Sequence, residues 1–219
     1  MDRIADAFTW PVRDPGWPSK LLVIALILLI PIVGTINGIG WMLTALDRLR
    51  AGDQTLPPAN LGYLGRGFRL FTVILVYGLA IALLAGLVYL PAVLIFVHQG
   101  QGNANAAVVS GGVLLSLLSF SIATLGTLAL NFVMPSIVLA TDRGGIAGGL
   151  RFAKVVRSAR FSLSASLIAG LMLIAAGFIG SVGVVACGVG VLFTSAYSLA
   201  MQAWIVHCFE LGPNPAQAV

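Results

Sequence analysis

The amino-acid sequence predicts an all-α membrane protein, a polytopic bundle of four to five transmembrane crossings with additional interfacial helices. Hydrophobic residues make up 59% of the 219 residues and charged residues only 9%. A soluble domain has about 25% charged residues, which help to cover its surface with polar groups. The apolar residues also gather in runs long enough for a helix to cross a bilayer core of about 30 Å. We therefore expect one membrane domain over residues 1–219.

The first twenty residues predict a short interfacial segment. Apolar side chains fall on one side at helical spacing, and two tryptophans are typical of the headgroup level of a bilayer. The residues concerned are Ile4, Ala5, Phe8, Trp10 and Trp17. Pro11, Pro15 and Pro18 prevent a long helix in this segment.

The first apolar run, residues 21–46, supports two interpretations. At about 1.5 Å per residue it is long enough for one tilted crossing. Its middle, residues 31–40, contains one proline, three glycines, Thr35 and Asn37. Such residues invite a break at membrane depth, which is tolerated where protein or a water-filled cavity covers the freed backbone. A re-entrant helical hairpin is therefore the alternative to a single crossing.

Four further apolar stretches predict transmembrane helices over residues 68–97, 107–140, 161–184 and 187–209. In the run that ends at residue 140, we expect Pro135 to introduce a kink or to begin an interfacial turn. Residues 161–209 carry no formal charge apart from the titratable His207. At about 1.5 Å per residue they are too long for one crossing, so we expect two helices with a glycine-rich turn near residues 183–190.

The segment 144–160 predicts a basic amphipathic helix that lies on an anionic membrane surface. Ile146, Leu150 and Ala153 lie along one face of that helix, and the basic residues lie mostly elsewhere. We therefore expect contacts with lipid headgroups from five basic side chains: Arg143, Arg151, Lys154, Arg157 and Arg160.

The basic residues also predict the orientation of the chain in a plasma membrane. They are concentrated in the loops 47–67 and 141–160, which the positive-inside rule places in the cytoplasm together with the C-terminus. If the first run crosses once, the N-terminal tail lies outside. If that run is a hairpin, all twelve Lys and Arg residues lie inside, which the rule favours.

The ionisable residues predict a protein that is not an enzyme. All seven acidic residues lie outside or at the edges of the apolar runs, whereas proton-coupled transport and carboxylate catalysis at membrane depth need such a group inside. No metal-ligand motif occurs, and no cofactor is predicted. His98 and His207 are candidate axial ligands for haem or pigment, although a loop or packing histidine is the simpler interpretation of each. The basic residues form no block interleaved with aromatics, so we expect no binding to nucleic acid.

Small residues at four-residue spacing predict close helix packing. They are Gly34, Gly38, Gly78, Ala82, Gly86, Gly170 and Gly180. Such ridges pack helices within one bundle or dock a partner subunit. Three polar side chains, Asn37, Asn131 and Gln202, are expected at membrane depth, where they join interhelical hydrogen bonds or line a polar path.

Two sets of residues carry a resemblance to known families. The first is Asp14-Pro-Gly-Trp17-x-x-Lys20, followed by Arg48-x-Arg50-x-Gly52-x-x-x-Leu56-Pro57 and by Gly65 or Gly67. On these residues the chain resembles the prokaryotic membrane-protein family named domain of unknown function 4013. The second, Pro135-Ser-Ile-Val-Leu with Gly145-Ile146-x-x-Gly149-Leu150-x-x-Ala153, is similar to the membrane domains attached to some glycerophosphodiester phosphodiesterases.

The resemblance implies a bacterial or archaeal polytopic membrane protein and gives no reaction. The catalytic barrel of the phosphodiesterases has no counterpart in this chain. We therefore expect a non-catalytic accessory or scaffold subunit of a larger membrane complex, with other membrane subunits and anionic lipids as partners. The alternative is a transporter or channel for a small solute or lipid, which the broken first run and the polar groups at depth favour.

Overall fold

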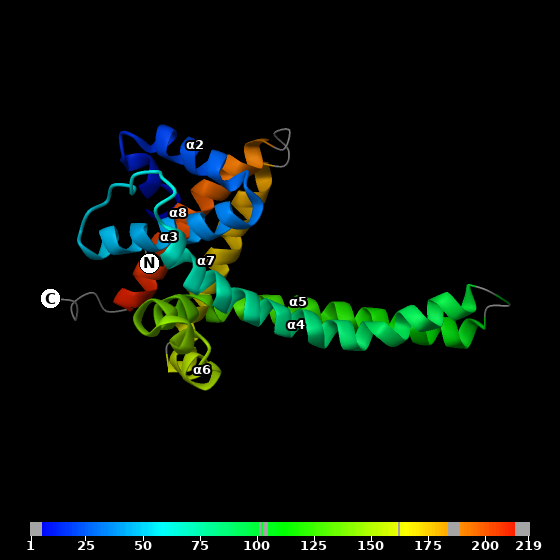
Figure 1. Cartoon of the computed structure of the whole chain (residues 1–219). Coiled ribbons are helices and arrows are strands. Elements are labelled where there is room, and N and C mark those ends of the chain that lie inside the picture. Colours follow the sequence, from blue (N-terminus) through cyan, green and yellow to red (C-terminus); the bar gives the residue numbers. More distant parts are fainter. Residues whose placement is uncertain (1–5, 101, 103–104, 162, 184–188, 213–219) are drawn as a thin grey trace. The chain divides into compact units, whose positions relative to one another are not determined.

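The computed structural model describes residues 6–100, 102, 105–161, 163–183 and 189–212. All regular elements within these residues are helices, so the predicted all-α class is confirmed. Two short 3-10 turns, η1 and η2, precede seven α-helices (Figure 1). Their bounds are η1 Asp6–Phe8, η2 Trp10–Arg13, α2 Trp17–Leu28, α3 Pro31–Arg50, α4 Leu64–Gln99, α5 Ala106–Gly149, α6 Phe152–Phe161, α7 Leu163–Val182 and α8 Val189–Leu211.

Four of these helices, α4, α5, α7 and α8, are long and apolar enough to cross a membrane. The chain is therefore a multi-pass membrane protein. It folds as two compact units, of which the larger contains residues 1–73 and 131–219 and the smaller contains residues 74–130.

The first apolar run forms a helical hairpin in the larger unit. α2 ends at Leu28 and α3 begins at Pro31, because proline suits the first turn of a helix and cannot continue the preceding one. The 12 residues of α2 span only about 18 Å, less than the thickness of a bilayer core. Gly34 lets the two helices approach, since a β-carbon there would lie 2.2 Å from the Ile27 carbonyl oxygen. The expected break in the first run is therefore present, just before the predicted 31–40 stretch, and it gives this run the helical form that the hairpin interpretation requires.

α8 is the helix around which the larger unit packs. It contacts α7, α3 and α2, and its buried side chains include Ala200, Met201 and Ile205. α7 runs back along α8, where Thr194 Oγ1 donates a hydrogen bond to the Gly180 carbonyl oxygen at 2.7 Å. These two helices end and begin at the two sides of the predicted turn, whose residues 184–188 lie outside the described part of the chain.

The N-terminal segment packs on α8, which corrects one expectation from the sequence. Trp10 is fully buried, its Nε1 donates to the Ala200 carbonyl oxygen at 3.2 Å, and its ring stacks on Trp204 at 5.7 Å. Trp10 is therefore a core residue and not an anchor at the headgroup level, because α8 supplies both its apolar contact and its hydrogen-bond acceptor. Trp17 is half-buried beside Phe193, and Ile4 and Ala5 lie outside the described residues.

The smaller unit is a hairpin of α4 and α5, in which residues 74–99 and 106–130 lie side by side (Figure 1). Ser119 Oγ donates to the Ala85 carbonyl oxygen across the pair at 2.8 Å. Gly126 brings the helices together, since a β-carbon there would lie 2.8 Å from Ile81 Cγ2. Large apolar side chains such as Leu83 and Leu114 point outward and are more than half exposed, as expected for helices that face lipid.

The end of α5 corrects the predicted helix over 144–160. Gly145 has φ 62° and ψ −161° and interrupts the helix, a backbone conformation that essentially only glycine adopts. A second interruption at Leu150 and Arg151 separates α6, which begins at Phe152. The apolar periodicity continued through both breaks, so it gave no sign of them. Pro135 lies inside α5, so no turn begins there. The helix is interrupted at Gly145 instead.

Candidate functional site at the charged end of the larger unit

Asp14 joins both ends of the α2–α3 hairpin. Its Oδ2 accepts hydrogen bonds from Lys20 Nζ at 2.6 Å and from the Leu56 backbone N–H at 2.8 Å, and its Oδ1 accepts from the Gly16 N–H at 2.8 Å. Lys20 lies in the first turn of α2 and Leu56 in the loop after α3. The start of α2 and the chain that leaves α3 therefore lie at the same end, which is the geometry of a re-entrant hairpin.

The Asp14 carboxyl is held in its charged form. It is 4% exposed, and burial alone would raise its pKa. The hydrogen bonds from Lys20, Gly16 and Leu56 outweigh burial and hold the pKa of Asp14 below its ordinary value. This carboxylate therefore acts as a structural anchor for the loop.

An ion-pair network joins the ends of four helices. Arg50 of α3 bonds both Asp142 of α5 and Glu210 of α8 at 2.7 Å. Arg66 of α4 bonds Asp142 at 2.7 Å and also pairs with Asp47. The network also includes Arg143, which donates to Glu210 at 2.6 Å. Together with Asp14 and Lys20, these six residues define the charged end of the larger unit.

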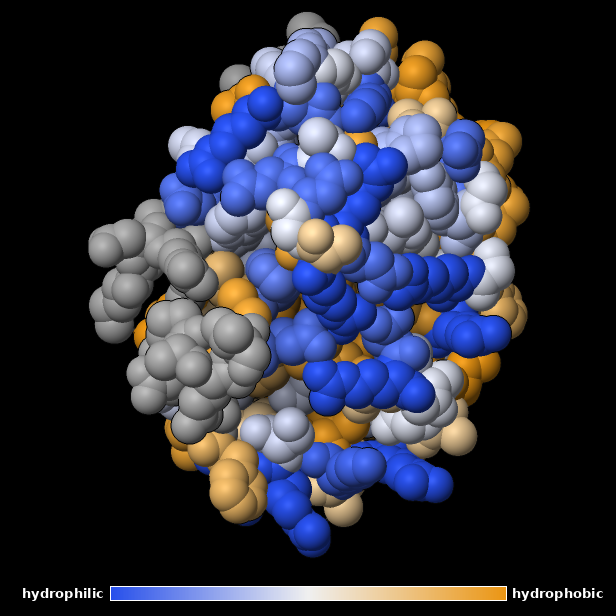
Figure 2. Space-filling view, turned by 90° about the vertical axis from the view of Figure 1, so that its left-hand side faces the viewer, coloured by the Kyte–Doolittle hydropathy of each residue, from blue (hydrophilic) through white to orange (hydrophobic). Residues whose placement is uncertain are grey.

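Every acidic side chain that the structure describes is ion-paired. Asp6 pairs with Arg13 at 2.9 Å, and Asp53 pairs with Arg48 at 3.4 Å, in addition to the pairs of Asp14, Asp47, Asp142 and Glu210 given above. Figure 2 shows hydrophilic side chains over most of the face that carries the 51–63 loop. An opposite charge at hydrogen-bond distance favours the ionised form of a carboxylate, so these groups are suited to holding helix ends together.

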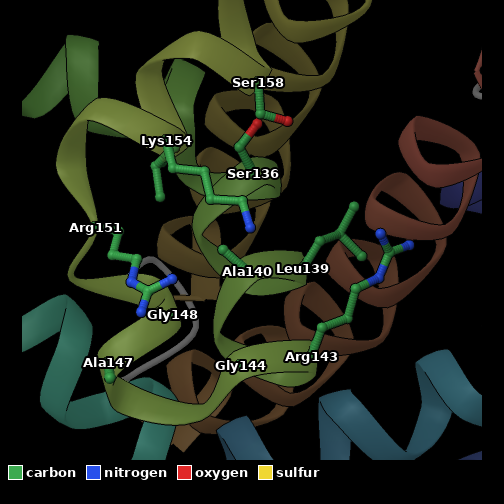
Figure 3. Close-up of a pocket in the computed structure, with 11 residues that line it drawn as sticks. Ser136, Leu139, Ala140, Arg143, Gly144, Ala147, Gly148, Arg151, Lys154 and Ser158 are labelled. Carbon is green, nitrogen blue, oxygen red and sulfur yellow. The ribbon is translucent and has the colours of Figure 1, made fainter.

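A pocket beside the charged end gathers basic and hydroxyl side chains (Figure 3). It has a volume of about 450 Å³ and lies between the last turns of α5, the turn after Gly144 and α6. Lys154 extends its ammonium group over the hollow, while Arg143 turns away toward α8. We call this site the basic pocket; its lining residues are Ser136, Leu139, Ala140, Arg143, Gly144, Ala147, Gly148, Arg151, Lys154, Val155 and Ser158.

Three of the five basic residues expected at lipid headgroups thus line one pocket. Arg157 and Arg160 lie on α6 outside it, in a shallower hollow with Phe152 and Phe161. On the opposite face of α6, Val155 and Ala159 are buried. Ser136 is a pocket residue that the sequence interpretation missed; its only signal was its place after Pro135 in the quoted motif.

The model of one protein family, described as a protein of unknown function (DUF4013), matches residues 23–189. This chain belongs to the DUF4013 family. No curated protein and no solved structure matches it. The family match contains Arg50, Arg66, Asp142 and the whole basic pocket, whereas Asp14, Lys20 and Glu210 lie outside it.

Asn37 of this DUF4013 protein holds a loop. Its Nδ2 donates to the Asn60 carbonyl oxygen at 2.8 Å, and its Oδ1 accepts from the Tyr63 N–H at 3.2 Å. Trp41 Nε1 similarly donates to the Pro57 carbonyl oxygen at 3.2 Å. Asn37 was expected to join an interhelical hydrogen bond or to line a polar path. It instead fastens the 56–63 loop onto α3, a role that the sequence around Asn37 and in the loop did not predict.

The other polar groups expected at depth lie on separate helices. Asn131 is half-buried on α5. Gln202 of α8 donates to Ser198 Oγ at 3.3 Å and lines a groove between the α2–α3 hairpin and α7–α8, whose volume is about 530 Å³. Thr35 and Ser195 also line this groove.

The two candidate histidines occupy unlike surroundings. His98 is exposed near the end of α4. His207 is half-buried on α8, and its ring makes a T-shaped contact with Trp204 at a centroid distance of 6.5 Å. Within the described residues, no cluster of three or more His, Cys, Asp or Glu side chains could hold a metal ion.

The predicted small-residue ridges divide between the two units. In the larger unit, a β-carbon on Gly38 would lie 2.8 Å from Leu199 Cδ1, and one on Gly170 would lie 2.3 Å from Phe132 Cδ1. Gly180 has ordinary contacts with Ser198. In the smaller unit, Gly78 and Gly86 meet no described heavy atom within 4 Å of the β-carbon position, and Ala82 between them is exposed.

Proposed function

We propose that this DUF4013 protein is a non-catalytic accessory or scaffold subunit of a larger membrane complex. The observation that carries the proposal is the pairing of all six described acidic side chains with basic residues. A general acid or a proton carrier needs a carboxyl group whose pKa is raised toward neutral pH. Ion pairing and donated hydrogen bonds act in the opposite direction, which favours a structural use of these residues.

A row of small residues along α4, which we call the open ridge, supports the proposal of a partner subunit. Gly78, Ala82 and Gly86 recur at four-residue spacing on a helix that is otherwise rich in large apolar residues. In a bilayer, helices associate through close van der Waals packing at such small residues. A partner helix on this ridge would fill the space that the described residues leave open beside Gly78 and Gly86.

We further propose that the charged end faces the cytoplasm at the inner membrane of a prokaryotic cell. The hairpin form of α2–α3 supports this orientation, because it brings Arg13 and Lys20 to the same end as Arg48 and Arg50. With four crossings and one re-entrant hairpin, the basic loops and both termini lie on one side. The positive-inside rule makes that side the cytoplasmic one.

The experiment that tests the subunit proposal is site-specific photocrosslinking in native membranes, followed by native sizing and mass spectrometry. A photoreactive residue replaces Ala82 on the ridge, and the matched control replaces Leu84, which lies about 200° around the same helix. We expect one crosslinked product of fixed mass, in stoichiometric amount, from position 82 and not from position 84. A monomer that crosslinks only to lipid from both positions would contradict the proposal.

The groove beside Gln202 favours the second candidate function, a transporter or channel for a small solute or lipid. Polar side chains at the membrane depth of two crossing helices can line a substrate path. Labelling distinguishes the two functions: Ser195→Cys, in a chain whose Cys187 and Cys208 are replaced by serine, is treated with an impermeant thiol reagent from each side. Reaction from both sides supports transport, and protection from both sides supports the structural role.

A further inference from the structure

We propose that the basic pocket binds a phosphate oxyanion, carried either by the headgroup of an anionic lipid or by free phosphate. This site goes beyond the accessory role proposed above and does not depend on it. Three observations point to it: a buried hydroxyl without a hydrogen-bond partner among the described residues, two cations that line the same pocket without an ion pair among those residues, and a pocket shaped by a glycine turn.

The hydroxyl group belongs to Ser136. Its side chain is 3% exposed, and Oγ is buried without a hydrogen-bond partner among the described residues. Serine and threonine residues elsewhere in the same helix donate to the carbonyl four residues earlier, as Thr141 does to Ile137 and Ser116 does to Gly112. A buried hydroxyl without such a bond is energetically unfavourable. A ligand oxygen in the pocket would accept its hydrogen.

The cations are Arg151 and Lys154. Neither makes an ion pair within the part of the chain that the structure describes, whereas the third basic residue, Arg143, is bonded to Glu210 at 2.6 Å. Figure 3 shows the Lys154 ammonium group over the centre of the hollow, on the side where Ser136 and Ser158 lie. The pocket therefore presents two uncompensated positive charges and two hydroxyl groups to one space.

The backbone shapes this space for a compact anion. The turn at Gly144 and Gly145 folds the chain back against α5, and it comes so close that a β-carbon on Gly148 would lie 2.5 Å from the Ala140 carbonyl oxygen. A tetrahedral phosphate offers several oxygens in different directions, so a hydroxyl, an ammonium and a guanidinium can bond to it together. The volume of about 450 Å³ also leaves room for the glycerol portion of a headgroup.

The surroundings give a lipid access to the pocket. Phe152 and Phe161 on α6 are 64% and 89% exposed, and aromatic side chains beside basic ones are typical of a helix at the membrane interface. A headgroup phosphate at this level would meet the pocket while its acyl chains remain among the apolar side chains. Free phosphate would reach the same donors from water.

Titration of the full-length protein in a neutral detergent tests the proposal. The probes are dioctanoyl phosphatidylglycerol and inorganic phosphate, with dioctanoylglycerol as the probe that lacks a phosphate. The variants are Lys154→Gln and Ser136→Ala. Arg157→Gln is the matched control, because Arg157 is an exposed cation of the same helix that does not line the pocket.

We expect Lys154→Gln to weaken binding of the phosphate-bearing probe about tenfold or more, and Ser136→Ala to weaken it about threefold to tenfold. Arg157→Gln should stay within about twofold of the wild type, and Lys154→Arg should retain binding. Ser136→Ala removes a hydroxyl that has no hydrogen-bond partner among the described residues, so the thermal midpoint of this variant without ligand should equal or exceed that of the wild type.

The two probes distinguish the sources of the phosphate. Pocket-dependent binding of phosphatidylglycerol that millimolar phosphate does not compete with identifies the lipid, and pocket-dependent binding of phosphate alone identifies the free anion. Competition between the two supports recognition of the phosphate group itself. Equal losses in Lys154→Gln and Arg157→Gln, or no binding of either probe by the wild type, would overturn the proposal.

Discussion

The two units of this DUF4013 protein are held together by different interactions. In the larger unit, ion pairs and hydrogen bonds to loop backbone join helix ends, and α8 buries side chains such as Ala200, Met201 and Ile205. In the smaller unit, α4 and α5 meet at Gly126 and through the Ser119 hydroxyl, while large side chains such as Leu83 and Leu114 are exposed. The larger unit should therefore respond both to loss of charge and to loss of close packing, whereas the smaller unit should respond to loss of its packing and of the Ser119 hydrogen bond.

The largest effect is expected where helix backbones are closest in the larger unit. A β-carbon on Gly67 of α4 would lie 1.8 Å from the Ile36 carbonyl oxygen of α3, and backbone atoms cannot give way as a side chain can. We expect Gly67→Ala to lower the free energy of unfolding by about 3 kcal/mol. Titration with dodecyl sulfate in mixed micelles measures this free energy of unfolding.

Gly65→Ala is the matched control, because a β-carbon there meets no described heavy atom within 4 Å. It should be neutral or stabilising by up to about 1 kcal/mol, since alanine favours helix more than glycine does. Equal destabilisation by both substitutions would mean that the close approach of α3 and α4 is not present.

Removal of the central arginine should have the next largest effect. Arg50→Gln leaves Glu210 with only Arg143 and Asp142 with only Arg66, and we expect a loss of about 2–3 kcal/mol. The exposed pair of Arg13 with Asp6, with side chains 43% and 40% exposed, should contribute only about 0–1 kcal/mol. A difference of less than about 0.5 kcal/mol between Arg50→Gln and Arg13→Gln in the same titration would show that the network does not hold the helix ends.

Asp14→Asn tests the hairpin anchor, whose contribution to stability should depend on pH. We expect a loss of about 1–3 kcal/mol at neutral pH, because the pairing with Lys20 is removed. The pKa of Asp14 is lowered on folding, so its contribution is present above its ordinary value near 3.8 and disappears as pH falls through the lower, folded value. The difference in thermal midpoint between wild type and variant should shrink on acidification, and a difference that stays constant down to pH 2 would exclude the carboxylate as its cause.

The smallest effect is expected in the smaller unit. Ser119→Ala removes the hydrogen bond between α5 and the Ala85 carbonyl oxygen, which should cost about 1 kcal/mol. Ser121→Ala is the control, because Ser121 donates to Leu117 of its own helix. Crosslinking between cysteines placed across α4 and α5 reports whether this pair loosens, and equal behaviour of the two variants would remove the role assigned to Ser119.

Much of the fold could be predicted from the sequence because the signals are local. Apolar runs predicted the four long helices, the residues around Pro31 predicted the hairpin as an alternative, and the glycines near 183–190 predicted that two separate helices, α7 and α8, lie on either side of them. Membrane helices form all backbone hydrogen bonds within themselves, so hydrophobicity and helix breakers carry most of the information.

The charged end could not be predicted in the same way. Arg50 is separated from Glu210 by 160 residues and Asp14 from Leu56 by 42, and nothing local specifies such pairs. The burial of Trp10 could not be predicted either, because an indole ring suits both a membrane interface and a buried position against α8, where its N–H finds an acceptor. The prediction of one helix over 144–160 was wrong for a different reason. The glycines of this segment indicated breaks in the helix, but the apolar periodicity was given more weight.

Side-specific cysteine labelling tests most directly whether the charged residues lie together on one side of the membrane. Val12→Cys and Leu61→Cys, at exposed positions before α2 and after α3, are compared with Gly102→Cys after α4 in a chain without other cysteines. The account predicts that positions 12 and 61 react from the same side and position 102 from the other. Reaction of positions 12 and 61 from opposite sides would mean that the first apolar run crosses the membrane once, which would contradict the Asp14–Lys20–Leu56 contact and the charged end built on it.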